Sequence, residues 1–556
     1  MLKVAESIVD RLKAVGTEYF FLLTGGDQPL WIALHEANIK MVVARSENSA
    51  VYMADGYARA SGKPAIVYGQ AGPGAANVAS ALADPFWAQT PVIALTGANS
   101  TKTDYIGEYQ SLEQMSLFAP VTKWNGIAAN ASRVPDLLTL AIQQAMAGSR
   151  GPTHLDVPKD FFGQETDYHS LSRSFLHQPA PIPPDTSTVE DACRILLAAE
   201  KPVILAGDGV LRSGAGDSIQ ALAETLNIPI ATTMGGKTSV PAEHVLNIGV
   251  IGRYSSKAAN DLVSESDCVL VVGSRLGGLA TRGYSIPNRR AHIVSINTDP
   301  NVFDVSYPTA VKLLSDAKLT LDAINQRVSD TSTSSAIQKW TEYAKERVTE
   351  WRYNLNEAVD AVASSSVLSP LTVLKSMSRY NNEITLVADT GYMAAWTGVL
   401  FPTVRPNSYF RAIGSLGWAF PASLGVQLAR NEKVVCVTGD GGFGYHLADI
   451  ETAVRYRIPV VIVVFNNNGL VFEYHEQKYR HGGNVIAEAN DLSDVDYSAV
   501  GRALGAEGCR IRTKDEFERE FRSALENEKP TVLDVVIDRE AFPPVTNFER
   551  VVERTI

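Results

Sequence analysis

Two short motifs towards the end of the chain carry residue types that could hold a metal ion and a phosphate group. Gly439-Asp440-Gly441-Gly442 offers a carboxylate followed by glycines, and Asn466-Asn467-Asn468-Gly469 offers amide oxygens and an irregular backbone. Mg²⁺ prefers hard oxygen ligands and keeps phosphate oxygens among them. Glycines at the start of a helix let backbone N–H groups face a phosphate. The motifs therefore predict a metal–diphosphate site in which Asp440, Asn467 and Gly469 hold the metal.

The sequence around these motifs predicts one βαβ unit. Residues 433–438 and 459–465 are short apolar runs typical of buried parallel strands, and helical periodicity spans Tyr445 to Arg457. Ligands of such sheets lie at the carboxyl ends of the strands, which is where both motifs stand. For either motif alone, the alternative is a tight turn capped by Asp440, or asparagines that only end a strand.

Gly439-Asp440-Gly441 followed by Asn466-Asn467 resembles the diphosphate/Mg²⁺ signature of thiamine-diphosphate enzymes. The chain is most similar to the acetolactate synthase and pyruvate decarboxylase superfamily. Residues 45–50, with 54–59 and 72–77, resemble the pyrimidine-binding domain of that superfamily. The matching glutamate there hydrogen-bonds N1′ of the aminopyrimidine and so promotes loss of the proton from thiazolium C2. The resemblance implies this role for Glu47, against the alternative of a solvated charge in a first helical turn.

The same resemblance implies three further catalytic residues. Gln110 stands in a loop that resembles the family's substrate-facing Phe-Gln-Glu loop, with Tyr for Phe and Ser for Glu. Asp27 and Glu473 stand where pyruvate decarboxylases carry acids that relay protons. A surface-loop glutamine and two solvated charges are the alternatives.

The cofactor contacts implied by the resemblance include Leu416, whose match wedges between the two rings of the cofactor; a core leucine is the alternative. The full set of expected cofactor contacts is Glu47, Gly72, Pro73, Asn77, Thr390, Gly391, Gly414, Leu416, Gly439, Gly441, Gly442, Asn467, Gly469, Leu470 and Val471.

The alternation of apolar strand patterns with helical patterns predicts an α/β protein with three Rossmann-like, doubly wound parallel sheets. We expect a pyrimidine-binding domain over 1–165, a Pro-rich linker over 166–186, a central domain over 187–335, and a connecting helix (336–363) that begins a diphosphate-binding domain over 336–556. In the central domain, 249–253 and 273–278 could hold a nucleotide. The matching places bind FAD or ADP in some relatives and are empty in many others, so both ligands and an empty domain stay open.

Composition narrows the class of protein. The chain has 556 residues and a net charge of −11, which argues against nucleic acid as a partner. Its four cysteines form no CxxC pair, which fits neither a zinc site nor a disulfide framework and favours a reducing cytoplasm. No apolar run is long enough to cross a membrane. We expect a cytoplasmic enzyme that is not bound to membranes.

The implied reaction makes or breaks a carbon–carbon bond next to a carbonyl, as in 2-oxo acid decarboxylation or carboligation. A 2-hydroxyacyl-CoA lyase or oxalyl-CoA decarboxylase is the alternative, and a non-catalytic nucleotide-binding relative is an alternative of another class. The chain lacks the His-His pair of pyruvate decarboxylases near position 104, and acetolactate synthases have an apolar residue where Glu473 stands. In this superfamily the pyrimidine site of one subunit faces the diphosphate site of another. The resemblance therefore implies a homodimer or homotetramer acting on a 2-oxo acid, aldehyde or acyl-CoA.

Overall fold

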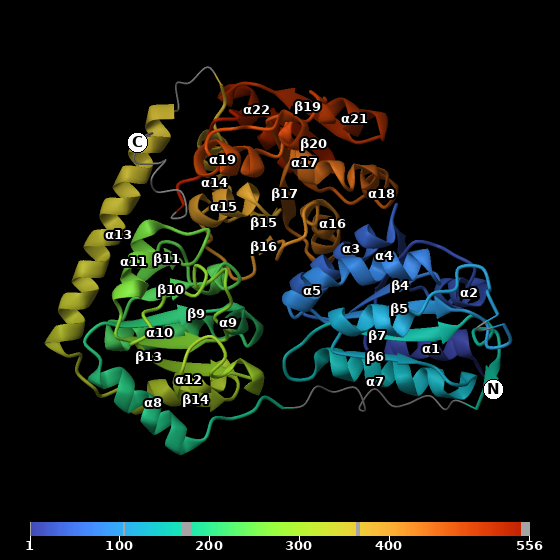
Figure 1. Ribbon diagram of the computed structural model, residues 1–556, viewed down its shortest axis with the longest axis horizontal. Helices are drawn as coiled ribbons and strands as arrows, with labels where there is room; N and C mark the ends of the chain where they lie inside the picture. Colours follow the sequence, from blue (N-terminus) through green and yellow to red (C-terminus); the bar gives the residue numbers. More distant parts are fainter. Residues whose placement is uncertain (1, 104–105, 168–179, 363–366, 546–556) are drawn as a thin grey trace.

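The computed structural model describes residues 2–103, 106–167, 180–362 and 367–545. Figure 1 shows three lobes around a common centre, each built on one six-stranded parallel sheet. This architecture confirms the predicted class of three Rossmann-like α/β domains. Of the predicted linker, residues 168–179 lie outside the described residues. Across the described ranges, no helix is both long enough and apolar enough to span a membrane.

The N-terminal lobe has the strand order β3-β2-β4-β5-β7-β6. Its inner strands are buried on both faces, as expected when helices cover a parallel sheet on both sides, and all of them except β7 are largely apolar. One face packs against α1, α2 and α7, and the other packs against α3 and α4. The strands are β2 (Tyr19–Leu22), β3 (Lys40–Val43), β4 (Ala65–Gly69), β5 (Val92–Ala98), β6 (Trp124–Ile127) and β7 (Thr153–Pro158). The main helices are α1 (Val4–Ala14), α2 (Gln28–Glu36), α3 (Glu47–Ser61), α4 (Pro73–Ala81), α5 (Ala83–Trp87), α6 (Gln114–Phe118) and α7 (Val134–Met146).

The central lobe has a different strand order, β11-β10-β9-β12-β13-β14. When the strands of this lobe are numbered in chain order, the sheet has the strand order of dinucleotide-binding proteins. The connections between strands change direction between β9 and β12. The strands are β9 (Pro202–Ala206), β10 (Ile230–Thr232), β11 (Asn247–Val250), β12 (Cys268–Val272), β13 (His292–Asn297) and β14 (Thr309–Leu314). The main helices are α8 (Thr186–Ala198), α9 (Asp208–Arg212), α10 (Gly216–Leu226), α11 (Lys257–Glu265) and α12 (Ala317–Val328).

The C-terminal lobe repeats the strand order of the N-terminal lobe, as β16-β15-β17-β18-β20-β19. The long helix α13 (Ser335–Val362) leads into it from the central lobe along one edge of the molecule (Figure 1), as the sequence predicted. The strands are β15 (Ile384–Ala388), β16 (Tyr409–Arg411), β17 (Lys433–Gly439), β18 (Val461–Asn466), β19 (Glu507–Ile511) and β20 (Thr531–Val536). The main helices are α14 (Pro370–Ser378), α15 (Tyr392–Leu400), α16 (Ala419–Ala429), α17 (Asp440–Gly444), α18 (Ile450–Arg455), α19 (Val471–Arg480), α20 (Ala487–Asn490), α21 (Tyr497–Ala503) and α22 (Lys514–Glu526).

The prediction of a single helix over Tyr445 to Arg457 is wrong. Helix α17 begins at Asp440 itself, and the chain then breaks at His446 before α18. The His446 ring hydrogen-bonds the Ser49 hydroxyl at 2.9 Å, and Asp449 accepts the Arg45 N–H at 2.8 Å. These contacts with the N-terminal lobe stabilise the break, which the local periodicity could not reveal.

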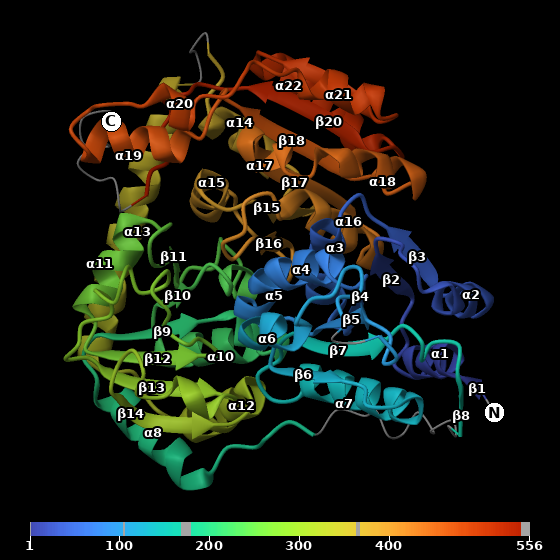
Figure 2. The same ribbon diagram turned by 45° about the vertical axis from the view of Figure 1, so that its right-hand side comes forward.

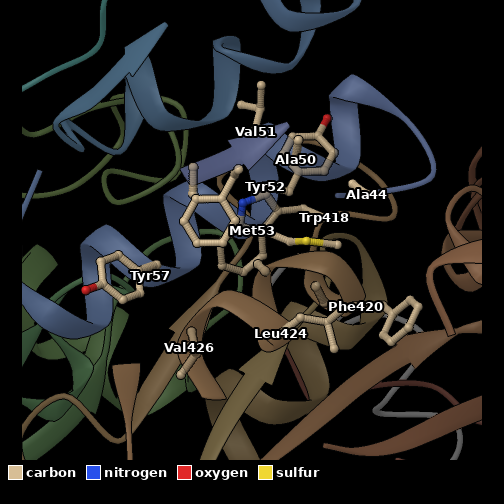
Figure 3. Close-up of a cluster of buried hydrophobic side chains, with 14 of the residues drawn as sticks. Ala44, Ala50, Val51, Tyr52, Met53, Tyr57, Trp418, Phe420, Leu424 and Val426 are labelled. Carbon is tan, nitrogen blue, oxygen red and sulfur yellow. The ribbon is translucent and has the colours of Figure 1, made fainter. Parts of the chain in front are cut away.

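The N- and C-terminal lobes meet where α3 crosses α16 (Figures 2 and 3). The two backbones approach so closely that a Cβ on Gly56 would lie 2.1 Å from the Ala422 carbonyl oxygen, and one on Gly425 would lie 1.8 Å from that of Met53. Only glycine fits both places. The buried side chains around the crossing in Figure 3 include Tyr52, Met53, Tyr57, Trp418, Phe420, Leu424 and Val426.

Candidate active site

The two predicted metal-site motifs lie side by side at the carboxyl ends of the neighbouring strands β17 and β18. Asp440 is buried, and its two carboxylate oxygens accept the N–H groups of Gly441 and Gly469, each at 2.9 Å. Burial raises the pKa of the Asp440 carboxyl to about 6, although the backbone N–H groups that face it act in the opposite direction. A bound cation would offset the cost of burying this charge.

The side chain of Asn467 supplies the sharpest test of a metal at this place. Its Oδ1 atom is buried and has no hydrogen-bond partner among the described residues. Buried amide oxygens are normally paired, and an orphaned one beside a buried carboxylate suits a hard cation. No three His, Cys, Asp or Glu side chains gather as a metal cluster in the described ranges. The predicted set of one carboxylate, one amide and one backbone carbonyl does not need such a cluster.

Glycines make room around this half of the site. A Cβ on Gly442 would lie 2.7 Å from Asp389 Oδ2, and one on Gly469 would lie 2.7 Å from the Asn490 carbonyl oxygen. Gly439 is the N-cap of α17, so the N–H group of Gly442 lies in its first turn, where a phosphate could bind, whereas the Gly441 N–H donates to the Asp440 carboxylate. The glycines thus fit a diphosphate beside the metal.

The loop that carries Leu416 lies directly above this glycine turn. A Cβ on Gly442 would contact Leu416 Cδ1 at 3.3 Å. Leu416 is only half-buried, although it is apolar, and Gly414 is exposed. An apolar side chain left partly open beside the phosphate turn fits a ring of the cofactor better than it fits the protein core.

Asp389, at the end of β15, ties the loop to the sheet. It accepts the Gly417 N–H at 3.1 Å, the Thr390 N–H at 2.9 Å and the Thr438 hydroxyl at 2.9 Å. Burial raises the pKa of Asp389 to about 7. Thr390 follows it directly, and Gly391 takes a φ of +65° as the N-cap of α15. Asp389 therefore holds the segment of Thr390 and Gly391 close to the loop that carries Leu416, whereas the Gly414 N–H is bonded to Asp84.

Helix α19 begins beside the metal motif and contains the last predicted site residues. Leu470 is its N-cap and Val471 its first residue, and Leu470 Cδ2 lies 2.6 Å from where a Cβ of Gly441 would stand. Glu473, one turn further on, is exposed. Its side chain is free to meet a second molecule, and the alternative of a solvated charge stays open for it.

The predicted pyrimidine half lies on the N-terminal lobe. Glu47 is the first residue of α3 and is buried, with 8% of its surface exposed. The exposed Asn77 donates to Glu47 Oε2 at 3.0 Å, and a Cβ on Gly74 would lie 3.1 Å from Glu47 Oε1. Gly72 and Pro73 begin α4 next to this pair. Helix α4 therefore presents Gly72, Pro73 and Asn77 around one side of the glutamate.

Gln110 stands close to this half and is held in a strained conformation. Its φ is +62°, and a Cβ on Gly72 would lie 2.4 Å from the Gln110 carbonyl oxygen. Strain of this kind is typical of functional loops. Gln110 Oε1 accepts from Gln70 Nε2 at 3.2 Å.

Asp27 ends the turn after β2 and is buried, which raises the pKa of its carboxyl to about 6 although Lys159 acts in the opposite direction. Its Oδ2 and the Tyr68 hydroxyl both lie 2.9 Å from where a Cβ of Gly97 would stand. The Tyr68 hydroxyl is buried and has no hydrogen-bond partner among the described residues. The Asp27 carboxyl, with its raised pKa, and the unpaired Tyr68 hydroxyl thus lie close to the same point beside Gly97.

Sequence reasoning missed Gln70, Tyr68 and Asp389. Gln70 lies against Gly25, Gly26 and Gln110. Each of the three stands at or just past the carboxyl end of a strand, where ligands of parallel sheets bind. That position was the one available signal, because nothing in their local sequence sets them apart.

A cavity of about 830 Å³ opens at the carboxyl ends of β9 and β12, and residues of all three lobes line it. Ser274, Arg275 and Gly277 from the predicted nucleotide segment line it, whereas residues 249–253 do not. The Arg275 guanidinium lies 4.6 Å from the ring of Trp87, which belongs to the N-terminal lobe. The cavity therefore offers an aromatic face to a ligand with a flat ring, and cations to a ligand with a phosphate.

Three doubly wound sheets, with a buried Asp–Asn pair beside glycines on one lobe and a buried glutamate on another, define an enzyme of the thiamine-diphosphate type. Comparison with known families agrees. The chain matches the thiamine pyrophosphate enzyme N-terminal TPP binding domain over residues 2–117, the central domain over 189–324 and the C-terminal TPP binding domain over 389–535. The chain belongs to the thiamine pyrophosphate enzyme family, as the sequence predicted.

Relatives match over nearly the whole chain. A probable acetolactate synthase large subunit of Methanococcus aeolicus is 30% identical, over 96% of this chain and 92% of the relative. A sulfoacetaldehyde acetyltransferase of Castellaniella defragrans is 28% identical, over 97% and 94%. The acetolactate synthase isozyme 3 large subunit of Escherichia coli is 26% identical, over 97% and 95%. The predicted similarity to acetolactate synthases is confirmed.

Proposed function

We propose that this chain decarboxylates a 2-oxo acid and joins the remaining acyl unit to a second carbonyl, with thiamine diphosphate and Mg²⁺ as cofactors. The orphaned, buried Asn467 Oδ1 beside Asp440 carries the proposal, because it is a ligand atom without a partner at the place where the metal is expected. Thiamine diphosphate, when bound, supplies the carbanion chemistry for such bonds. Asp440, Asn467 and the Gly469 carbonyl would hold the metal.

Four side chains would act on protons and on the substrate. Glu47 would hold a proton at N1′ of the aminopyrimidine, and Asn77 orients its carboxylate. Asp27, with its pKa near 6, can take up or release a proton near neutral pH. Gln110 would donate to a substrate oxygen, and exposed Glu473 would serve from the other lobe as a second acid. Decarboxylation with carboligation makes the enzyme a transferase or a carbon–carbon lyase, according to its acceptor.

A second copy of the chain would complete the site. The loop that carries Gln110 exposes Ile106, Tyr109 and Leu112, with 73%, 84% and 47% of their surfaces open. Three apolar side chains around a functional residue favour cover by another protein surface. We infer a homodimer, or a homotetramer built from two dimers, in which the Glu47 half of one copy faces the Asp440 half of the other.

A substrate panel tests the proposal. Purified protein with thiamine diphosphate and Mg²⁺ is given 2-oxo acids with and without aldehydes, sulfoacetaldehyde, and 2-hydroxyacyl-CoAs, while CO₂ and ketols are measured. CO₂ together with a new ketol supports carboligation. Products from acyl-CoAs alone would move the chain to the CoA-lyase alternative. Absence of cofactor binding and of turnover would overturn the proposal and leave the non-catalytic alternative.

We further propose a nucleotide, FAD or ADP, in the cavity at the carboxyl ends of β9 and β12. The change of direction between β9 and β12, the cavity at these strand ends and Arg275 over Trp87 support this ligand. A yellow protein with flavin absorbance would indicate FAD, and nucleotide released on denaturation would identify ADP. The predicted domain bounds and the cytoplasmic location stay predictions.

A further inference from the structure

A buried carboxylate of the N-terminal lobe, Asp84, lies against the loop of the C-terminal lobe that carries Leu416. Asp84 belongs to the short helix α5, at the end of the N-terminal lobe that faces the centre of the molecule (Figures 1 and 2), and its side chain is fully buried. It accepts the backbone N–H groups of three consecutive residues, Ile413, Gly414 and Ser415, at 3.0–3.1 Å. One carboxylate thus fixes the backbone on the approach to Leu416.

The other end of this loop is held by the C-terminal lobe itself. Gly417 donates its N–H to Asp389. Leu416 therefore stands between two buried carboxylates that bind the backbone on either side of it. Gly414, between the bonded Ile413 and Ser415, is exposed and has open space around it, so packing alone would leave the loop free to move.

A second layer of charged groups fixes Asp84. Arg59 donates to Asp84 at 2.9 Å and to Asp55 at 2.5 Å, and its Nη1 donates to the Arg411 carbonyl oxygen at 2.8 Å. Trp418, next to the loop, donates its indole N–H to Asp55 at 2.8 Å and lies under the Arg59 guanidinium at 4.5 Å. Buried charge-assisted hydrogen bonds of this kind are strong and directional.

We propose that Asp84, fixed by Arg59, is a positioning residue that pre-orders the Leu416 loop before the cofactor binds. The inference rests on the proposed function, because it gives Leu416 a ring of thiamine diphosphate to contact. Pre-ordering lowers the entropy lost when a ligand binds. Asp84 touches neither the cofactor nor the substrate in this account. It acts through the backbone of residues 413–415.

The test compares Asp84→Asn with Asp267→Asn in the full-length chain. The Asp84→Asn change keeps the shape of the side chain but leaves only one accepting oxygen. The NH₂ group of the amide would then face a backbone N–H group of the loop, which is also a donor. Asp267 is the matched control, because its carboxylate also accepts two consecutive backbone N–H groups, those of Glu200 and Lys201 at 2.8 and 2.9 Å, but in the central lobe. Hydrogen exchange of residues 413–417 is measured without cofactor, and the Kd for thiamine diphosphate is measured by tryptophan fluorescence.

We expect Asp84→Asn to speed exchange at 413–415 and to weaken thiamine diphosphate binding, each by at least about tenfold, and Asp267→Asn to change neither. Arg59→Lys should move both readouts in the same direction by less, and it replaces Asp84→Asn if that variant does not fold. Wild-type protection and wild-type Kd in Asp84→Asn would overturn the inference while the proposed function stands. An unsubstituted chain that binds no thiamine diphosphate would instead overturn the proposed function, and the cofactor role of Asp84 with it.

Discussion

The N- and C-terminal lobes have the same strand order but place different chemistry at equivalent strand ends. After the first strand stand Asp27 in one lobe and Asp389 in the other. In each lobe one helix follows the second strand: α3 in the N-terminal lobe and α16 in the C-terminal lobe. Helix α3 begins with the carboxylate of Glu47, whereas α16 begins just after the loop that carries the apolar Leu416. After the third strand, Gly72 in the N-terminal lobe corresponds to Gly439 in the C-terminal lobe, where Asp440 follows. The fold supplies the strand ends, and single side chains decide which part of a cofactor each lobe can bind.

Glu47 and Asp440 should fail in different ways if the two lobes divide the work as proposed. We expect Glu47→Gln to lower kcat by about 10²–10⁴-fold, because a proton-transfer group is lost, with little change in thiamine diphosphate affinity. Steady-state kinetics beside fluorescence titration measure both. Loss of cofactor binding with kcat per bound cofactor retained would contradict the role of Glu47.

For Asp440 in the C-terminal lobe we expect the opposite: a loss of cofactor affinity. Asp440→Asn removes the charge from the metal site, so Mg²⁺-dependent binding of thiamine diphosphate should weaken by about 100-fold, whereas binding without Mg²⁺ should change little. Titration at several Mg²⁺ concentrations measures the difference. An Asp440→Asn chain with the Mg²⁺ dependence of the wild type would exclude this carboxylate as a ligand.

The crossing of α3 and α16 can be broken without touching either half of the site. Gly425→Ala places a methyl group 1.8 Å from the Met53 carbonyl oxygen, so we expect a loss of about 3 kcal/mol in the free energy of unfolding. Gly163→Ala is the control, because its Cβ would meet only Pro29, at 4.0 Å. Equal stability of the two variants in urea unfolding would show that the lobes adjust freely at the crossing.

The buried Asp27 carboxylate should lower the free energy of unfolding at neutral pH, although we expect the reaction to need this residue. Its pKa is about 6 in the folded chain and 3.8 as the ordinary value, so the folded state binds the extra proton between these pH values and loses stability as the pH rises from 3.8 to 6. Asp27→Asn should therefore raise the unfolding free energy by about 3 kcal/mol at pH 7.5, by little near pH 4, and lower kcat. Glu36→Gln, an exposed carboxylate change in the same lobe, is the control. A gain of the same size at both pH values would contradict the raised pKa.

The sequence predicted the features whose causes are local or periodic. Apolar runs such as 433–438 and 459–465 marked buried strands, and Asp440 and Asn467 stood out because each follows such a run. The helix break at His446 could not be predicted, because its partners Arg45 and Ser49 lie in the other lobe. Asp84 and Gln70 were missed for a related reason. Their roles come from contacts with residues that are distant in sequence, which periodicity does not record.

The most direct test of a site shared between two copies mixes the two impaired variants, at a thiamine diphosphate concentration that leaves Asp440→Asn unsaturated. Chains with Glu47→Gln and chains with Asp440→Asn are co-expressed with different tags, and the mixed dimer is isolated. If each site takes Glu47 from one copy and Asp440 from the other, one site of the mixed dimer carries both substitutions and its second site carries neither. We predict about half of the wild-type activity. A mixed dimer as impaired as its parents would show that no site combines these halves from two copies.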